Sequence, residues 1–147
     1  YRWGFDRDPF SVGRVWEVGR SLDVNAMAAA GRRLVGEHDF SSFRAAGCDA
    51  RSPVRRIYDV RVERSGERTA ELWVTGSAFL KYMVRVIAGT LQEVGAGRRG
   101  AASIADVLAA RDRRRAGVTA PPEGLTLEAM YHPLVDWPSP ASLAVRR

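Results

Sequence analysis

The sequence predicts an α+β domain in which helices pack on one face of a mainly antiparallel sheet. Two alternating apolar and polar segments, 54–64 and 69–75, are separated by a Ser-Gly-Glu turn, which is typical of an antiparallel hairpin. Two other segments, 24–35 and 79–94, repeat apolar residues at helical spacing. Strands that pair locally among interspersed helices favour the α+β class.

The N-terminal part contains a strand end and the first helix. Tyr1, Trp3 and Phe5 alternate along the chain, which predicts a strand with one aromatic face. Asp23 stands directly before the first helical segment and predicts its N-cap, while Gly36 predicts its end. The segment 37–53 shows no periodicity, and we expect a loop there.

The second half of the chain continues with helices and ends in loops. Gly95 ends the helix predicted over 79–94, and Ser103 is the expected cap of a shorter helix that runs to Ala110. In segment 117–124, two consecutive prolines predict a rigid extended loop, and 125–131 predicts another strand.

The end of the chain is rich in Pro, Ser and Ala after Pro133, which predicts fraying. We therefore expect one domain over 1–133 and a flexible tail over 134–147.

The composition excludes several protein classes. The chain has 147 residues, of which 46% are hydrophobic, and a single cysteine, Cys48, which cannot form an internal disulfide or a cysteine-rich zinc site. No apolar run is long enough to span a membrane, and no secretory signal or initiating Met is visible. We expect a soluble cytoplasmic protein whose chain begins inside a longer one.

The chain is strongly basic, and nearly all of its positive charge comes from arginine. The 23 basic residues give a net charge of +6, and only Lys81 among them is a lysine. Arginine matches phosphate oxygens in bidentate fashion, which favours a polyanionic partner. A GC-rich genome would produce the same bias through its codons, so the charge alone leaves both explanations open.

Three segments carry distinctive motifs in a fixed order. They are 36–44 (Gly-Glu-His-Asp-Phe-Ser-Ser-Phe-Arg), 78–85 (Ala-Phe-Leu-Lys-Tyr-Met-Val-Arg) and 119–125 (Thr-Ala-Pro-Pro-Glu-Gly-Leu). Together they resemble the C-terminal half of the TruA family of tRNA pseudouridine synthases. Three motifs in the same order are far more specific than any one alone, and the resemblance extends over roughly 1–133.

The resemblance implies an enzyme that detaches uridine at N1 in the anticodon arm of tRNA, rotates the base and rejoins it to the ribose through C5. It implies no cofactor and no metal, a homodimer, and a sheet whose second face lines a cleft for catalysis and RNA. The family's nucleophilic aspartate lies in an N-terminal half with an Arg-Thr/Ser-Asp-Gly motif, which nothing here matches. We therefore expect the N-terminal domain of the same protein to be a partner, and this chain to be inactive alone.

Two residues carry catalytic roles in the resemblance, and a third lies against the base. Arg85 matches the arginine that pairs with the aspartate, and a guanidinium beside a carboxylate keeps it ionised. Tyr1 matches a tyrosine that stacks on the base and is placed to take the C5 proton. Leu125 matches a position that packs under the base.

Other residues in these motifs are expected to line the RNA path. The resemblance places the loop after residue 36 at the cleft wall, and nearby arginines are candidates for phosphate contacts. The substrate-binding set is His38, Phe43, Arg44, Arg51 and Arg55. Whether the arginine run 111–115 contacts tRNA or only caps a helix stays open.

Two other classes of function are compatible with the sequence. A non-catalytic RNA-binding module of α+β fold would bind single strands by stacking, and a protein-interaction domain would owe its arginines to codon usage. Arg85 discriminates between these hypotheses, because a binding module should expose it to solvent, whereas an enzyme should direct it into a cleft beside Tyr1 and the segment after the double proline.

Overall fold

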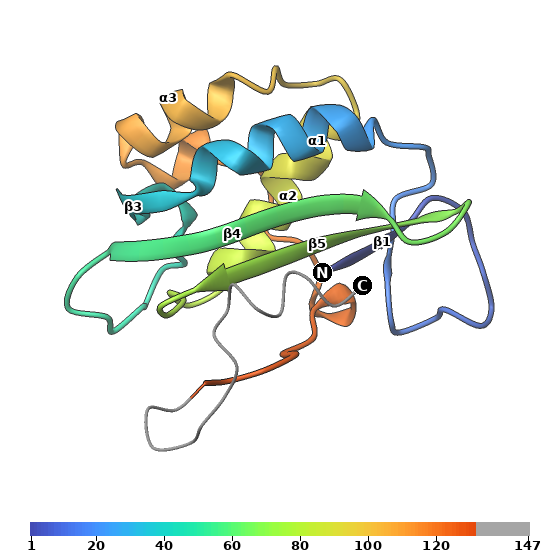
Figure 1. Ribbon diagram of the computed structural model, residues 1–147, viewed down its shortest axis with the longest axis horizontal. Helices are drawn as coiled ribbons and strands as arrows, with labels where there is room; N and C mark the ends of the chain where they lie inside the picture. Colours follow the sequence, from blue (N-terminus) through green and yellow to red (C-terminus); the bar gives the residue numbers. More distant parts are fainter. Residues whose placement is uncertain (132–147) are drawn as a thin grey trace.

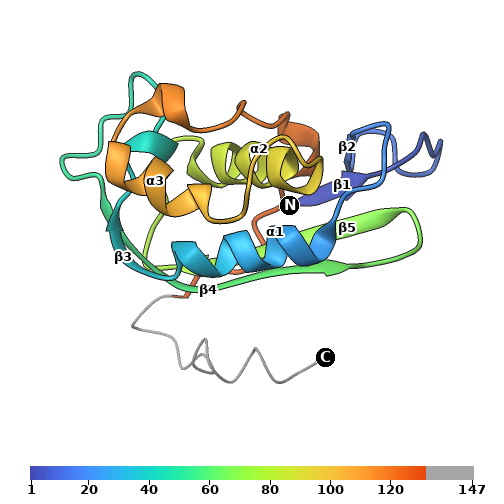
Figure 2. The ribbon, with the colours of Figure 1, turned by 90° about the horizontal axis from the view of Figure 1, so that it is seen from above.

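A computed structural model describes residues 1–131 as one five-stranded sheet with helices on one side (Figures 1 and 2). The strand order is β2-β1-β5-β4-β3. The strands are β1 (Arg2–Gly4), β2 (Trp16–Glu17), β3 (Gly36–Asp39), β4 (Val54–Arg64) and β5 (Thr69–Gly76). The helices are α1 (Val24–Gly31), α2 (Met83–Gly95) and α3 (Ser103–Ala110). The α+β class is confirmed.

The sheet is antiparallel at every pairing except one. The β4–β5 hairpin pairs from Asp59 with Thr75 to Arg64 with Ala70, and β1 continues the sheet on the other side of β5. Only β2 runs parallel to its neighbour, β1. The predicted hairpin and the mainly antiparallel sheet are therefore both confirmed.

The first helix begins where the sequence predicts. The Asp23 carboxylate accepts a hydrogen bond from the Ala26 amide at 2.9 Å, as an N-cap does. The helix ends at Gly31, earlier than predicted, and continues as a 3₁₀ turn over Arg32–Leu34. Gly31 lies so close to β4 that an added β-carbon would be 2.9 Å from Val60.

The loop predicted over 37–53 is corrected by the structure at its start. Gly36–Asp39 forms β3, which pairs with β4 from Gly36 with Ile57 to Asp39 with Val54, and a 3₁₀ turn follows at Ser41–Phe43. A strand of four residues is too short for alternation to be visible in the sequence. The open edge of β4, a tertiary feature, decides that it forms.

The strand predicted over 125–131 does not form. This segment has no regular structure, and Leu127 and Met130 are more than 70% exposed. A strand forms only by pairing with another strand, and 125–131 pairs with neither edge of the sheet, β2 or β3. The preceding loop is extended as predicted, apart from a 3₁₀ turn at Pro122–Gly124.

The two later helices differ from prediction at their starts. α2 begins at Met83 because Tyr82 has a left-handed backbone conformation, with φ of 60°. Ser103 is the first residue of α3, and its hydroxyl donates to the Gly100 carbonyl instead of capping a helix amide.

The tail expected over 134–147 lies outside the described residues. No helix in residues 1–131 is both long and apolar enough to cross a membrane.

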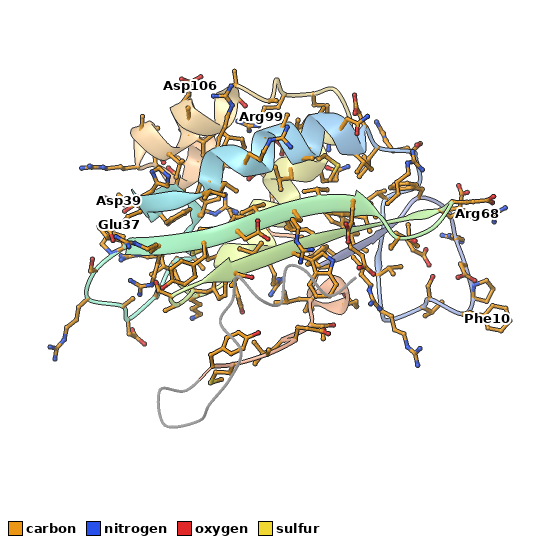
Figure 3. All side chains as sticks on the ribbon, in the orientation of Figure 1. Phe10, Glu37, Asp39, Arg68, Arg99 and Asp106 are labelled. Carbon is orange, nitrogen blue, oxygen red and sulfur yellow. The ribbon has the colours of Figure 1, made fainter. Side chains whose placement is uncertain are left out.

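A single hydrophobic core joins the sheet to the helices. Its largest fully buried side chains come from both layers. They are Trp3, Met27, Leu34, Phe40, Phe43, Ile57, Leu72, Met83, Ile87, Leu91 and Ile104. Charged side chains lie at the periphery: Figure 3 places Glu37 and Asp39 at one end of the sheet and Arg68 at the other.

Candidate functional site

Arg85 lies in the first turn of α2 and is partly buried. Its Nε donates to the Ala120 carbonyl at 2.6 Å, and the Ala120 amide donates back to the Arg85 carbonyl at 3.1 Å. The guanidinium carbon lies 4.4 Å from the ring centroid of Tyr82. Within residues 1–131, no carboxylate pairs with Arg85 and its two Nη groups form no hydrogen bond, so these donors are free for a ligand.

Tyr1 is buried beside the same loop. Its backbone exchanges hydrogen bonds with Leu72, which continues the β1–β5 pairing by one residue. Its hydroxyl donates to the Pro121 carbonyl at 2.8 Å. Burial raises the pKa of the Tyr1 phenol, Arg85 opposes this increase, and Glu123 adds to it. The neutral phenol is therefore the form that this environment favours.

The segment 120–125 brings the predicted residues together. Gly124 is buried, and an added β-carbon would be 2.6 Å from the Arg2 carbonyl and 2.8 Å from the Tyr1 ring, so only glycine fits here. The next residue, Leu125, is 41% exposed. Figure 1 shows this segment, in orange, beside the N-terminus. Arg85, Tyr1 and Leu125 thus meet at one loop.

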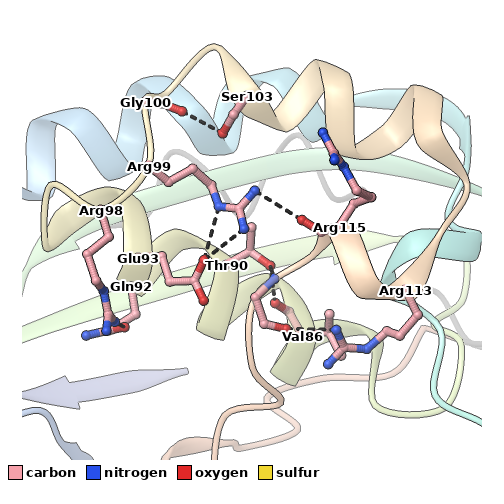
Figure 4. Close-up of polar contacts among 11 residues, drawn as sticks. Val86, Thr90, Gln92, Glu93, Arg98, Arg99, Gly100, Ser103, Arg113 and Arg115 are labelled. Atoms are coloured by element: carbon pink, nitrogen blue, oxygen red, sulfur yellow. Dashed lines mark hydrogen bonds and ion pairs between the residues drawn. The ribbon is translucent and has the colours of Figure 1, made fainter.

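The loop is fixed to α2 by close backbone contact (Figure 4). A β-carbon on Gly89 would overlap the Val118 carbonyl, and one on Gly117 would be 2.8 Å from the Thr90 Cα. The fully buried Thr90 hydroxyl donates to the Val86 carbonyl at 2.7 Å and accepts from the Gly117 amide at 2.9 Å. Two glycines and one threonine therefore let an extended segment lie directly on the helix.

Charged side chains reinforce this contact at both ends. Glu93 accepts two hydrogen bonds from Arg99, which also donates to the Arg115 carbonyl at 3.0 Å. Arg113 donates to the Gly117 carbonyl and to the Thr119 hydroxyl. The loop that holds Arg85 is thus itself held by a network that extends along α2 (Figure 4).

The arginine run 111–115 is largely engaged within the chain. Arg111 pairs with Asp39 at 3.3 Å, and Arg114 pairs with Asp112 at 2.8 Å. With Arg113 bound to the loop, three of the four arginine side chains have intramolecular partners. The Arg111 and Arg114 side chains are still 69% and 89% exposed, so contact of the run with tRNA stays open.

Two of the predicted phosphate-binding arginines, Arg44 and Arg51, lie in the segment between the Ser41–Phe43 turn and β4. This segment adjoins the start of α2, because the Ala45 amide donates to the Lys81 carbonyl and the Lys81 ammonium to the Gly47 carbonyl. Arg55 follows on β4, where its Nη1 donates to the carbonyls of Ser52 and Val54. The remaining two, Arg44 and Arg51, form no ion pair within residues 1–131.

His38 and Phe43 have different surroundings. His38 lies on β3 opposite Arg55, and its Nε2 is 3.0 Å from the Val35 carbonyl. Phe43 has no exposed surface and packs edge-on against Phe40, with 5.9 Å between ring centroids. In this structure Phe43 supports the loop from the core and is not available to a ligand.

Sequence reasoning missed the residues that hold Arg85. Tyr82 lies under the guanidinium, and the carbonyl of Ala120 accepts from it. The available signal was glycine placement: Gly89 and Gly117 lie within helix and loop segments where close backbone approach is a common reason for glycine. No group of His, Cys, Asp or Glu in residues 1–131 is arranged to hold a metal ion.

The comparisons with known proteins identify the family of the chain. A family model described as tRNA pseudouridine synthase matches residues 30–133. The chain belongs to this family. The matched range contains Arg85 and the loop 120–125, while Tyr1 lies before it.

Relatives in this synthase family align along most of the chain. A tRNA pseudouridine synthase A from Myxococcus xanthus is 51% identical over 126 residues, which are 86% of this chain and 48% of the relative. One from Geotalea uraniireducens is 44% identical over 126 residues, 86% of this chain and 51% of the relative. One from Methylococcus capsulatus is 51% identical over 112 residues, 76% of this chain and 41% of the relative. The chain spans about half the length of these synthases or less.

Proposed function

We propose that this chain forms the arginine-bearing half of a tRNA pseudouridine synthase, in which uridine in the anticodon arm of tRNA is isomerised. The observation that carries the proposal is the convergence of Arg85, Tyr1 and Leu125 on the loop 120–125, with both Nη groups of Arg85 unpaired in residues 1–131. The names of the relatives supply the reaction class and the tRNA substrate.

The reaction breaks the N1–C1′ bond, forms a C5–C1′ bond, moves one proton from C5 to solvent and returns one to N1. Atoms and electrons balance without an oxidant, a metal or a cofactor. The nucleophilic aspartate would come from a part of the protein outside this chain. Arg85 would pair with it, because a nearby guanidinium stabilises the ionised carboxylate and orients its oxygens.

Tyr1 and Leu125 would form the surface under the base. Tyr1 is rigidly placed by its hydroxyl bond to Pro121 and by contact with Trp3, whose ring centroid is 5.5 Å away. These contacts favour a packing role. Taking the C5 proton would require the phenol pKa to fall, and Arg85 is the group in residues 1–131 whose charge lowers it.

Phosphates of the tRNA backbone would contact Arg44, Arg51, Arg55 and His38. Arg44 adjoins the segment 45–47 that contacts Lys81 before α2, and His38 and Arg55 pair across β3 and β4. Because each phosphate contact releases counterions, binding should weaken steeply with salt. A homodimer in the cytoplasm completes the proposal, as the resemblance implies.

The test joins this chain to the N-terminal half of the Myxococcus xanthus relative and measures tritium release from tRNA labelled at C5 of uridine. We expect release by the joined protein and its loss, by more than roughly 100-fold, in R85A. R33A is the matched control, since Arg33 is exposed in the 3₁₀ turn after α1 and should leave release unchanged. A folded joined protein without release contradicts the proposal, and salt-dependent tRNA binding without release would support the RNA-binding module instead.

A further inference from the structure

Tyr82 has a backbone conformation that residues with a β-carbon avoid. Its φ and ψ are 60° and 9°, in the left-handed region. Within residues 1–131, the only other non-glycine residue with positive φ is Arg111, at the end of α3, where helices commonly terminate in this way. Tyr82 instead precedes a helix, where such a conformation has no capping function of this kind.

Local folding does not explain the choice of tyrosine at this position. The Tyr82 side chain forms no capping hydrogen bond, and the residue is 48% exposed, so burial in the core gives little compensation. Glycine adopts the same φ without a steric cost. An unfavourable conformation held by an exposed residue points to a function of its side chain.

The side chain contacts the central residue of the site. The Arg85 guanidinium carbon is 4.4 Å from the centroid of the Tyr82 ring, and the Lys81 ammonium is 5.9 Å from it. A cation over an aromatic face is attracted by the ring quadrupole, and a planar guanidinium is also oriented by it. The Ala120 carbonyl holds the same guanidinium at Nε.

Two contacts of different kinds therefore define the position of Arg85. The Nε hydrogen bond fixes one edge of the guanidinium, and the ring limits its rotation about that edge. The Nη groups, which have no partner in residues 1–131, are left at the remaining edge.

We propose that Tyr82 is a positioning residue, whose ring holds the Arg85 guanidinium in the plane that pairs with a carboxylate brought by the rest of the protein. The catalytic part of this inference rests on the proposed function. The placement of Arg85 by the ring does not, and it has a readout of its own.

The experiment compares Y82F, Y82L and Y82G with the unmodified protein. The first readout is the ¹H–¹⁵N resonance of Arg85 Nε–H, because an aromatic ring near the guanidinium shifts it. We expect the shift to be kept in Y82F and lost in Y82L, which retains apolar bulk without a ring. R85K identifies the resonance by removing it.

The second and third readouts are thermal unfolding and turnover. Thermal unfolding shows whether the variants are folded, and Y82G should keep a cooperative transition, because glycine adopts this left-handed conformation without a steric cost. In the joined protein, kcat should be retained in Y82F and fall roughly tenfold in Y82L and Y82G, with little change in KM for tRNA. Lower kcat in a variant that still unfolds cooperatively, with unchanged KM for tRNA, is a combination that a purely structural role would not give.

Two outcomes would overturn the inference. They are an unchanged Arg85 resonance in Y82L and full kcat in Y82L. If the unmodified joined protein releases no tritium, the proposed function fails, while the resonance still decides whether Tyr82 places Arg85.

Discussion

Arg85 and Ala120 are joined by two hydrogen bonds, one from the Arg85 side chain to the Ala120 carbonyl and one from the Ala120 amide to the Arg85 carbonyl. The pair links the first turn of α2 to a segment 35 residues later in the chain. Since the next carbonyl, of Pro121, accepts from the Tyr1 hydroxyl, two adjacent peptide units fix the positions of both side chains.

Thr90→Val should destabilise the protein by about 1–3 kcal/mol, because the buried Gly117 amide would lose its acceptor without gaining water. Urea unfolding measures the change. Thr90→Ser keeps the hydroxyl and should recover most of the loss. Equal stability of the valine and threonine proteins would show that this hydrogen bond does not hold the loop.

Gly124→Ala should cost about 1–3 kcal/mol, since its β-carbon would be 2.6 Å from a backbone oxygen and 2.8 Å from the Tyr1 ring. The displaced ring should also change the near-ultraviolet circular dichroism. Gly100→Ala is the control, because nothing lies within 4 Å of its added β-carbon, and it should change stability by less than roughly 0.5 kcal/mol.

The Tyr1 phenol should make stability depend on alkaline pH. Its pKa is raised in the folded state above the ordinary value of 10.0, chiefly by burial. The folded state therefore resists losing the proton, and this contribution is fully present below pH 10.0 and is lost as the pH rises further. Chemical unfolding of the unmodified protein and of Tyr1→Phe above that pH measures this contribution. The difference in free energy of unfolding between the two proteins should narrow as the pH rises, and a constant difference would contradict the prediction.

Removing one phosphate-binding arginine should reduce the slope of log affinity for tRNA against log salt by about one. The three variants to compare are Arg44→Ala, Arg51→Ala and Arg55→Ala. The measurement is filter binding of the joined protein across salt concentrations. Arg68→Ala is the matched control, because Arg68 lies at the opposite end of the sheet from β3 and the segment that follows it (Figure 3). An equal loss of slope in the control would mean that general charge, and not this surface, attracts tRNA.

Local signals explain the parts of the fold that the sequence predicts well. The hairpin of β4 and β5 follows from alternation around a short turn, and α1 follows from the Asp23 cap and its apolar spacing. Two predictions were wrong for one reason: a loop was predicted where β3 forms, and a strand was predicted over 125–131, where none forms. Whether a short segment pairs depends on whether the folded chain brings it alongside another strand, and the local sequence does not report that.

The sequence also predicted only part of the candidate site. The family resemblance selected Arg85, Tyr1 and Leu125, which the structure brings to one loop, but it also selected Phe43, which lies in the core. Residue type does not distinguish a buried phenylalanine from a ligand-binding one, because both have an apolar ring. The role of Tyr82 was invisible, since its contact with Arg85 depends on a left-handed residue that no local pattern marks.

The sequence by itself determined the fold class, the two principal helices, the hairpin, the family and the arginine on which the proposed chemistry depends. Only the tertiary structure decided where that arginine points, because its partners come from the loop at 120 and from a strained residue beside it. The same holds for Tyr1, whose hydroxyl meets a carbonyl 120 residues away. Periodicity and capping report contacts between near neighbours in the chain, whereas these contacts exist only once the packing of α2 against the loop has brought distant backbone together.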